Sequence, residues 1–279
     1  MESRLDTSLS VDWGAATDAG PVRTENQDSW LSAPPFFVVA DGMGGHAGGA
    51  QASAVAVHTL GSVMTSAFRG ERRLDVTDLD AAIEAAGHAV AELADPDDPS
   101  NSPGTTVTGV LALNTSEHPY WLTFNIGDSR TYVVGGGAIR QITKDHTAIQ
   151  EAKDLMEATH TQLAVPSAHV VTRALGGGLP GSPQADYAVV PIVDGDVAIL
   201  CTDGVHGVLS DDDLHRAATS GDSPADIAHF LVQAALGAGT RDNASALVVR
   251  ATTQQHVGNS RPITERLVQA VRPRVTGRE

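Results

Sequence analysis

The chain of 279 residues carries 34 acidic and 18 basic side chains, which gives a formal net charge of -16 at pH 7. This excess of negative charge repels nucleic-acid backbones and anionic membrane surfaces, so we expect neither as a partner. The length, together with 41% hydrophobic residues, fits one mixed α/β domain with a sizeable core.

The first predicted strand is the apolar run FFVVA at residues 36–40. A helix is expected after the glycine cluster at 42–49, with Val55 and Phe68 among its apolar residues. Gly61 lies inside this helix and lowers its intrinsic stability.

Two later helices have clearer signals. Over residues 78–94, after a possible cap at Thr77, apolar residues recur at alternating spacings of four and three. The expected buried face of this helix consists of Leu79, Ile83, Ala86, Val90 and Leu93. The other helix is predicted over 223–237, with Ser223 as N-cap and Pro224 at the first helical position. Its apolar face would consist of Ile227, Phe230, Leu231 and Ala234.

Further apolar runs rich in Val, Ile, Phe and Tyr predict additional strands. They cover residues 107–113, 120–126, 130–134, 187–192, 196–201 and 245–250. Strands grouped together, with helices between the groups, predict an α+β fold built of packed layers.

The first residues, the lengths of the apolar runs and the single cysteine indicate where the protein is located. The first residues lack the apolar stretch of a secretory signal, and no run of about 18 apolar residues occurs. Cys201 has no partner for an internal disulfide, which fits a reducing compartment. We therefore expect a cytoplasmic monomer without a membrane anchor.

The last residues differ in charge from the rest of the chain. Within 251–279 five Arg stand against two Glu, so this end is +3 and the preceding residues are -19. We expect a catalytic domain over residues 1–252 and a basic tail over 253–279, whose composition is typical of a disordered segment.

Acidic residues recur where the apolar runs end: Asp41, Asp128 and Asp203 follow such runs, and Asp242 comes just before one. Any one of them could be an ordinary turn residue, because Asp is common in turns and at strand ends. Four ionised carboxylates at matching strand ends would repel one another unless cations neutralise them. Since hard oxygen ligands favour magnesium or manganese, the pattern predicts a site for these metals.

Eight short segments carry a resemblance to a known family. They are GPVRTENQD (20–28), VVADGMGGHAGGAQAS (38–53), GTT (104–106), GDSR (127–130), TKDH (143–146), VTRALGG (171–177), LCTDGV (200–205) and RDNAS (241–245). In their order and content they resemble the metal-dependent protein phosphatases of type 2C, particularly the bacterial branch. The resemblance spans most of residues 12–250. It implies a four-layer sandwich of two antiparallel β-sheets flanked by pairs of helices, with metals at one end.

The resemblance also implies a set of metal ligands. Asp41 would bridge two metals, and the backbone oxygen of Gly42 would join one of them. Asp203 and Asp242 would complete the coordination of the other metal, and Asp128 would support a third metal. A hydroxide bridging the two metals would then attack the phosphate directly, because paired cations lower the pKa of a shared water and neutralise charge on an in-line displacement.

Four further positions have roles implied by the same segments. Arg23 would bind the substrate phosphate, since a guanidinium can grip two phosphate oxygens at once. Asp28 would orient metal-bound water from the outer shell. Gln27 stands where other members have Glu, so a contact at the second metal would be neutral here. His46 is open between two roles, a general acid for the leaving oxygen and a structural residue.

Residues 143–170 lie where the family carries a flap beside the active site. This segment departs from many bacterial relatives around 158–170, so substrate preference or ligation of a third metal could differ. Ser167 and His169 are the nearby candidates, and the sequence does not choose between them.

The predicted function is a metal-dependent protein serine/threonine phosphatase with two Mn²⁺ or Mg²⁺ ions and a possible third. Its partners would be phosphorylated proteins and a bacterial serine/threonine kinase that it opposes. One alternative is a catalytically silent module that binds phosphorylated partners, which the presence of Arg23, Asp41, Asp203 and Asp242 argues against. Another is a hydrolase of small phosphate esters or nucleotides, and no glycine-rich nucleotide motif supports it.

Overall fold

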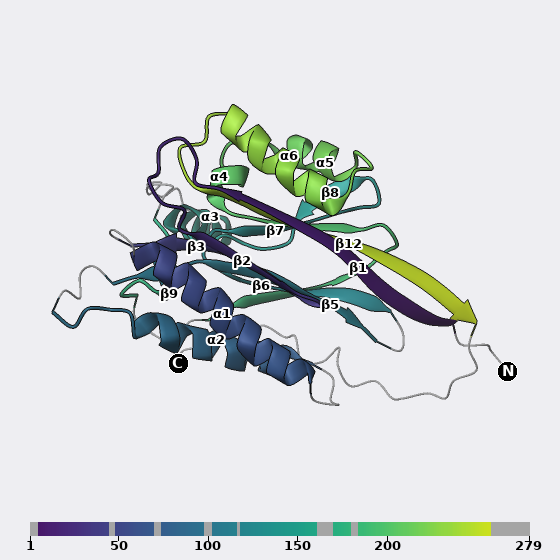
Figure 1. Cartoon of the computed structure of the whole chain (residues 1–279), viewed down its shortest axis with the longest axis horizontal. Coiled ribbons are helices and arrows are strands. Elements are labelled where there is room, and N and C mark those ends of the chain that lie inside the picture. Colours follow the sequence, from purple (N-terminus) through teal and green to yellow (C-terminus); the bar gives the residue numbers. More distant parts are fainter. Residues whose placement is uncertain are drawn as a thin grey trace.

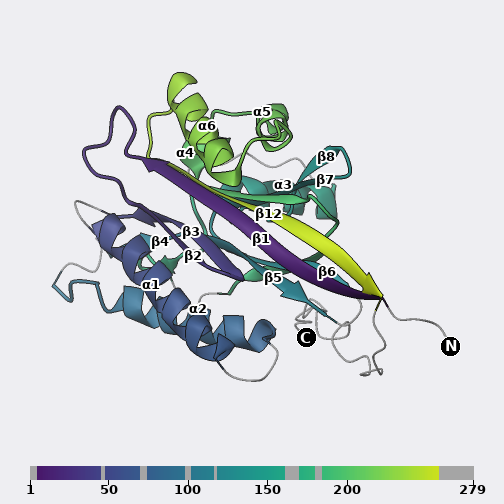
Figure 2. The ribbon, with the colours of Figure 1, turned by 45° about the vertical axis from the view of Figure 1, so that its right-hand side comes forward.

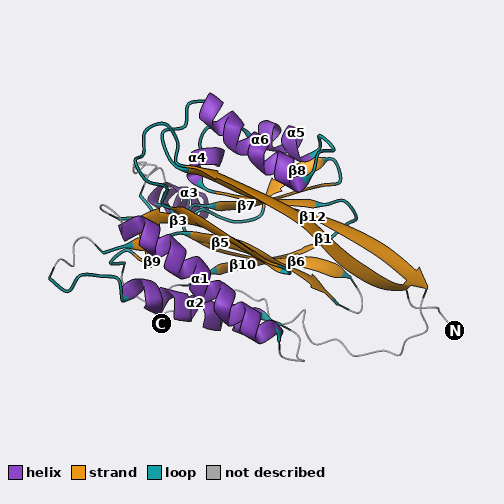
Figure 3. Cartoon of the chain, viewed as in Figure 1, coloured by secondary structure: helices purple, strands orange, loops and turns teal. Residues whose placement is uncertain are grey.

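The structure is a computed structural model that describes residues 5–44, 48–69, 74–97, 102–115, 118–160, 170–179 and 184–257. Two β-sheets lie face to face in the middle of the molecule, with helices on both outer faces (Figures 1 and 3). The turned view in Figure 2 shows the same four layers, with α1 and α2 on one side and α5 and α6 on the other. The predicted α+β sandwich is therefore confirmed.

One sheet has the strand order β1-β12-β11-β7-β8, and all its neighbouring strands are antiparallel. Its strands are β1 (Leu5–Asp18), β7 (Arg130–Gly135), β8 (Ala138–Gln141), β11 (Val197–Cys201) and β12 (Ala244–Val257). β1 and β12 pair along their whole length, from Leu5 opposite Val257 to Asp18 opposite Ala244. The domain boundary expected after residue 252 thus falls inside β12.

The second sheet has the order β10-β6-β5-β3-β4-β9, and β2 also pairs with β3. Its strands are β2 (Asp28–Ala33), β3 (Phe36–Met43), β4 (Gly104–Thr105), β5 (Val107–Asn114), β6 (Pro119–Ile126), β9 (Leu175–Gly176) and β10 (Asp186–Pro191). All pairings in this sheet are antiparallel as well.

The helices other than α3 cover the outer faces of the two sheets. The helices are α1 (Gly48–Phe68), α2 (Val76–Ala91), α3 (Ala148–Thr159), α4 (Asp203–His206), α5 (Asp211–Ala218) and α6 (Pro224–Gly237). α1 and α2 pack on the β3-β5-β6 sheet, and α4, α5 and α6 pack on the β1-β12-β11 sheet. Among the described residues, no helix is long and apolar enough to cross a membrane.

The apolar run of β3 shows why a strand in the middle of four layers needs hydrophobic residues at every position. Side chains alternate between the two faces of a strand. Phe36, Val38 and Ala40 pack against α1 and α2, whereas Phe37 and Val39 lie between the two sheets. All five are fully buried, and burying one large apolar side chain contributes about 1.5–3 kcal/mol.

The caps and buried faces of the helices agree in part with those predicted from the sequence. The hydroxyl of Ser223 caps α6 as predicted by accepting a hydrogen bond from the amide of Asp226. Phe230 was expected on the buried face of this helix, but it is 58% exposed. The cap of α2 was expected at Thr77 but is Asp75, whose carboxylate accepts from the Thr77 amide and which forms a reciprocal capping box with Asp78.

Gly61 is explained by packing rather than by helix propensity. It is buried in α1, and a Cβ atom at this position would lie 2.2 Å from Cδ2 of Leu31 on β2. The missing side chain lets the helix approach the sheet closely enough to cover it.

Candidate active site

Side chains from both sheets line one cavity of about 350 Å³. Asp41 comes from β3, Asp203 is the first residue of α4 after β11, and Asp242 lies just before β12. Arg23, from the loop between β1 and β2, and Asp128, from the loop between β6 and β7, complete the charged lining. The structure therefore gathers at one place carboxylates that lie at separate strand ends in the sequence.

Asp28 and Asp41 lie directly opposite each other across the β2-β3 ladder. The hydroxyl of Thr202 donates a hydrogen bond of 2.9 Å to Oδ2 of Asp28, while Oδ1 is shielded from solvent and has no hydrogen-bond partner within the described ranges. Burial and the nearby carboxylate of Asp203 raise the pKa of Asp28 to about 7. Burial, followed by repulsion from Asp28, raises the pKa of Asp41 well above its usual value. Full ionisation of this pair at neutral pH needs positive charge close by.

The backbone around Asp41 is held by the threonines of the GTT segment. The amide of Asp41 donates to Oγ1 of Thr106 at 3.0 Å, and its carbonyl accepts from Oγ1 of Thr105 at 2.8 Å and from the Thr106 amide at 2.9 Å. The next residue, Gly42, has no room for a side chain, because a Cβ there would lie 2.0 Å from the carbonyl oxygen of Gly49. These contacts fix the direction in which Asp41 and the Gly42 carbonyl point.

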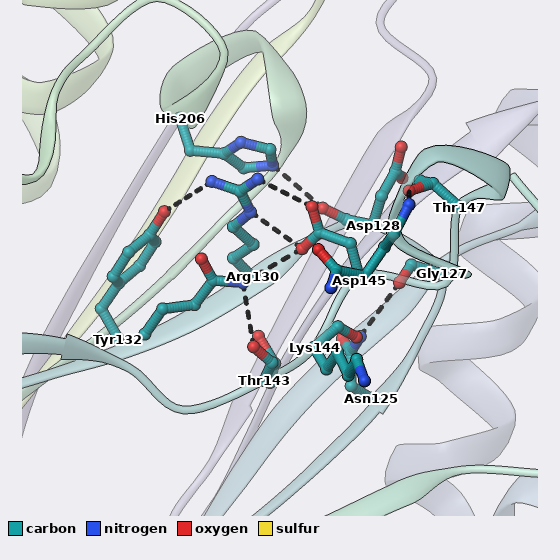
Figure 4. Close-up of polar contacts among 12 residues, drawn as sticks. Asn125, Gly127, Asp128, Arg130, Tyr132, Thr143, Lys144, Asp145, Thr147 and His206 are labelled. Atoms are coloured by element: carbon teal, nitrogen blue, oxygen red, sulfur yellow. Dashed lines mark hydrogen bonds and ion pairs between the residues drawn. The ribbon is translucent and has the colours of Figure 1, made fainter. Parts of the chain in front are cut away.

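Asp128 is placed by a turn that two histidines hold. Gly127 has a φ of +103°, and its amide donates to Nδ1 of His146 at 3.1 Å. Nε2 of His206 lies 2.9 Å from the carbonyl oxygen of Asp128, so Nε2 carries the hydrogen and donates it (Figure 4). Burial, followed by repulsion from Asp203, raises the pKa of the Asp128 carboxyl group to about 6.

An ion pair lies next to this turn (Figure 4). Arg130 donates from Nε and Nη2 to the two carboxylate oxygens of Asp145, at 2.9 Å and 2.7 Å. Its Nη1 also donates to the hydroxyl of Tyr132 at 3.0 Å. The pair ties the beginning of β7 to the segment that leads into α3.

Arg23 and Asp242 are bonded to each other within the cavity. Nε of Arg23 donates to Oδ1 of Asp242 at 2.8 Å, and Nη2 donates to Oδ2 at 2.6 Å. Both side chains remain partly exposed, with 54% of Arg23 and 37% of Asp242 accessible. The guanidinium of Arg23 therefore lies at the cavity and is hydrogen-bonded to the carboxylate of Asp242.

Similarity to known proteins shows the family of this chain. A family model described as protein phosphatase 2C matches residues 22–233. The chain belongs to the protein phosphatase 2C family.

Several members of the protein phosphatase 2C family are similar over most of this chain. The serine/threonine protein phosphatase PstP of Mycobacterium tuberculosis is 30% identical over 92% of this chain and 48% of its own length, so this chain spans about half of that relative. The serine/threonine phosphatase stp of Listeria innocua is 28% identical over 86% of this chain and 95% of its own length. The crystal structure of the PstP catalytic domain in complex with two manganese ions has a TM-score of 0.73 and 31% identity, covering 88% of this chain and 100% of that domain.

The donors of this protein phosphatase 2C site suit a hard divalent cation. They are carboxylate and carbonyl oxygens, and the shielded Oδ1 of Asp28 is a buried acceptor with no donor in the part of the chain that the structure describes. The repulsion among Asp28, Asp41 and Asp203 favours cations in the same place. In the described ranges no three His, Cys, Asp or Glu side chains are arranged as ligands of one ion, and both oxygens of Asp242 are bonded to Arg23. The residues therefore fit Mn²⁺ or Mg²⁺ by chemistry, and Asp242 must turn from Arg23 to take part.

Three residues that the sequence singles out lie outside the described residues: His46, Ser167 and His169. Their roles stay predictions. The described part of the flap contains α3, which begins after the N-cap Thr147 and buries none of its own side chains.

Asn243, to which the sequence assigned no role, supports the loop that carries Arg23. Its Oδ1 accepts from the amide of Gln27 at 2.8 Å, and its Nδ2 donates to the carbonyls of Ala19 at 2.8 Å and Glu25 at 3.0 Å. These bonds attach the loop that carries Arg23 to the start of β12. Its place next to Asp242 in the RDNAS segment was the available signal.

Proposed function

We propose that this chain is a metal-dependent phosphatase that hydrolyses phosphoserine and phosphothreonine in other proteins. The observation that carries the proposal is that Asp41, Asp128, Asp203 and Asp242 line the same cavity as Arg23. It is supported by relatives named serine/threonine protein phosphatases and by family membership. Because those relatives act on proteins by name, a serine/threonine kinase that phosphorylates the same substrates is the expected opposing partner.

Two divalent cations, with Mn²⁺ and Mg²⁺ as the candidates, would be held by oxygens around the cavity. We assign Asp41 and the carbonyl of Gly42 to one ion and Asp41, Asp203 and Asp242 to the other, with Asp128 as a candidate ligand of a third. When bound, such ions activate a water molecule and offset the negative charge of the phosphate.

The chain's own residues position the reactants. Arg23 would grip two phosphate oxygens with the same Nε and Nη2 atoms that now bond to Asp242. Asp28 would accept a hydrogen bond from the attacking water through Oδ1, because Thr202 already occupies Oδ2. His46 remains a candidate donor to the leaving serine or threonine oxygen.

Two other functions use the same residues in part. A silent phospho-binding module would need Arg23 but not the surrounding carboxylates, whose crowding raises their pKa and destabilises the ionised site when no cation is bound. A small-ester hydrolase would keep the metals but need no room beside the cavity for a polypeptide. The wide groove that adjoins the cavity favours a protein substrate over a small ester.

The test compares phosphate release from phosphoserine and phosphothreonine peptides with release from a small aryl phosphate, in Mn²⁺ and in chelator. We expect Mn²⁺-dependent release with a higher kcat/KM for the peptides. A higher kcat/KM for the aryl phosphate would favour the small-ester enzyme. Peptide binding without any release, in folded protein saturated with Mn²⁺, would favour the silent module.

A further inference from the structure

A groove of about 810 Å³ opens beside the catalytic cavity and shares Arg23, Asp128, Asp203 and Asp242 with it. One wall is the exposed side of α3, and the others are residues 22–24, the turn after α4 and residues 240–242. A phosphorylated side chain that reaches Arg23 would therefore place its own backbone in or along this groove.

The charged residues of the groove fall into three groups. Arg130 bonds to Asp145 and Arg23 to Asp242, and the carboxylates of Asp128 and Asp203 also line the catalytic cavity. Lys153 on α3 and Arg241 in the loop before β12 are exposed, and neither has a carboxylate partner among the residues that the structure describes. These two free cations face a groove in a chain whose net charge is -16.

The groove also contains apolar side chains. Val22 is 52% exposed, Val208 is 38% exposed, and Ile149 on α3 is half-buried. All three line the groove. Such surface suits the aliphatic parts of a bound polypeptide better than it suits free phosphate or a small ester.

We propose that this groove binds the polypeptide on either side of the phosphorylated residue and selects substrates with acidic residues there, through Lys153 and Arg241. The inference rests on the proposed function, since it assumes that the phosphorylated residue occupies the cavity at Arg23. The net negative charge of the protein repels an acidic segment. Such a segment is therefore expected to bind where the two cations of the groove offset this repulsion. Lys153 and Arg241 lie on different elements, which lets each contact a separate acidic side chain.

The test measures binding and turnover separately. Fluorescent phosphothreonine peptides with Glu on both sides are compared with matched peptides that carry Gln, first by anisotropy and then by phosphate release in Mn²⁺. We expect wild-type protein to prefer the acidic peptide, and we expect Lys153→Gln and Arg241→Gln each to reduce that preference by about two- to fivefold. Arg69→Gln, at an exposed cation after α1, is the matched control and should leave the preference unchanged.

Charge reversal gives the sharper outcome. Lys153→Glu should shift the preference toward peptides with Lys in the flanks, because the introduced carboxylate attracts those side chains. Equal affinity of wild-type protein for the Glu and Gln peptides, or a preference that survives both substitutions, would overturn the inference. Loss of all hydrolysis with the binding preference intact would instead contradict the proposed function and leave the groove assignment standing.

Discussion

Arg23 and Asp242 hold each other through two hydrogen bonds, although the family resemblance gives one of them to the substrate phosphate and the other to a metal. The two roles compete for the same contact. A cation that takes Asp242 releases the fork of Arg23, and an anion that takes Arg23 releases Asp242. Metal binding and phosphate binding are therefore expected to strengthen each other, and this coupling must be reciprocal.

Replacing Arg23 separates these two effects. In Arg23→Ala the Asp242 carboxylate does not have to break hydrogen bonds to Arg23 before it binds a metal ion. We therefore expect the affinity for Mn²⁺ to rise several-fold in calorimetric titration. The kcat/KM for a phosphothreonine peptide should fall by about tenfold or more, because a charge-assisted contact to the phosphate is lost. Arg69→Ala, at an exposed arginine that lines neither the cavity nor the groove, should leave the Mn²⁺ affinity as in wild type. An unchanged Mn²⁺ affinity in Arg23→Ala would refute the coupling.

The contact between His206 and the Asp128 carbonyl is expected to stabilise the turn that carries Asp128. His206→Ala leaves this carbonyl oxygen without its donor, which costs about 1–3 kcal/mol of unfolding free energy. Denaturant unfolding measures the loss. His229→Ala on α6, where the side chain is exposed, is the control and should change stability little. Equal stability of the two variants would show that the His206 contact is dispensable.

Asp186 makes a pH-dependent contribution to stability. Nδ1 of His146 accepts from Gly127, so its Nε2 carries the hydrogen and donates it to Asp186 at 3.1 Å. The contact with His146 and the nearby Arg173 lower the pKa of Asp186 to about 2. Because the folded pKa lies below the unfolded value of about 3.9, the stabilisation is complete above that value and is lost as the pH falls toward 2.

The measurement for Asp186 is urea unfolding of wild type and Asp186→Asn between pH 2.5 and 7. We expect the variant to be less stable at pH 6 and the difference to shrink steadily below pH 4. Asp97→Asn, in an exposed loop, serves as the control. A difference between wild type and Asp186→Asn that stays constant down to pH 2.5 would contradict the assignment.

Cys201 should be inert in the folded protein. It is fully buried on β11, and burial raises the pKa of its thiol to about 12. We therefore expect no reaction with a thiol reagent at pH 8 until the protein unfolds, and labelling after addition of denaturant. Rapid labelling under native conditions would mean that β11 is exposed in solution.

Much of the fold could be predicted from the sequence because its central strands are buried on both faces. Runs such as 36–40 and 245–250 therefore contain apolar residues at nearly every position. β1 was not predicted, since its sequence LDTSLSVDWGAATD is polar and contains a glycine. Its strand conformation depends on pairing with β12, more than 200 residues away, over the full register from Leu5 to Asp18.

The candidate site also contains residues that could be predicted from the sequence and residues that could not. The carboxylates could be predicted because Asp at the end of an apolar run has a local signal. His206 could not, because it contacts a backbone carbonyl that is distant in the chain, and such a contact leaves no periodicity or charge pattern. α3 was also missed, since its amphipathic sequence packs none of its residues into the core.

The most direct test of the account is the Mn²⁺ dependence of phosphate release from a phosphothreonine peptide by wild type and Asp203→Asn, with Mn²⁺ affinity measured on the same samples. Asp226→Asn, at an exposed carboxylate on α6, is the matched control. We predict that Asp203→Asn stays folded, binds Mn²⁺ more weakly and loses turnover by roughly 100-fold, whereas the control behaves as wild type. Turnover by wild type in chelator, or full activity and Mn²⁺ affinity in Asp203→Asn, would contradict a metal-dependent phosphatase centred on these carboxylates.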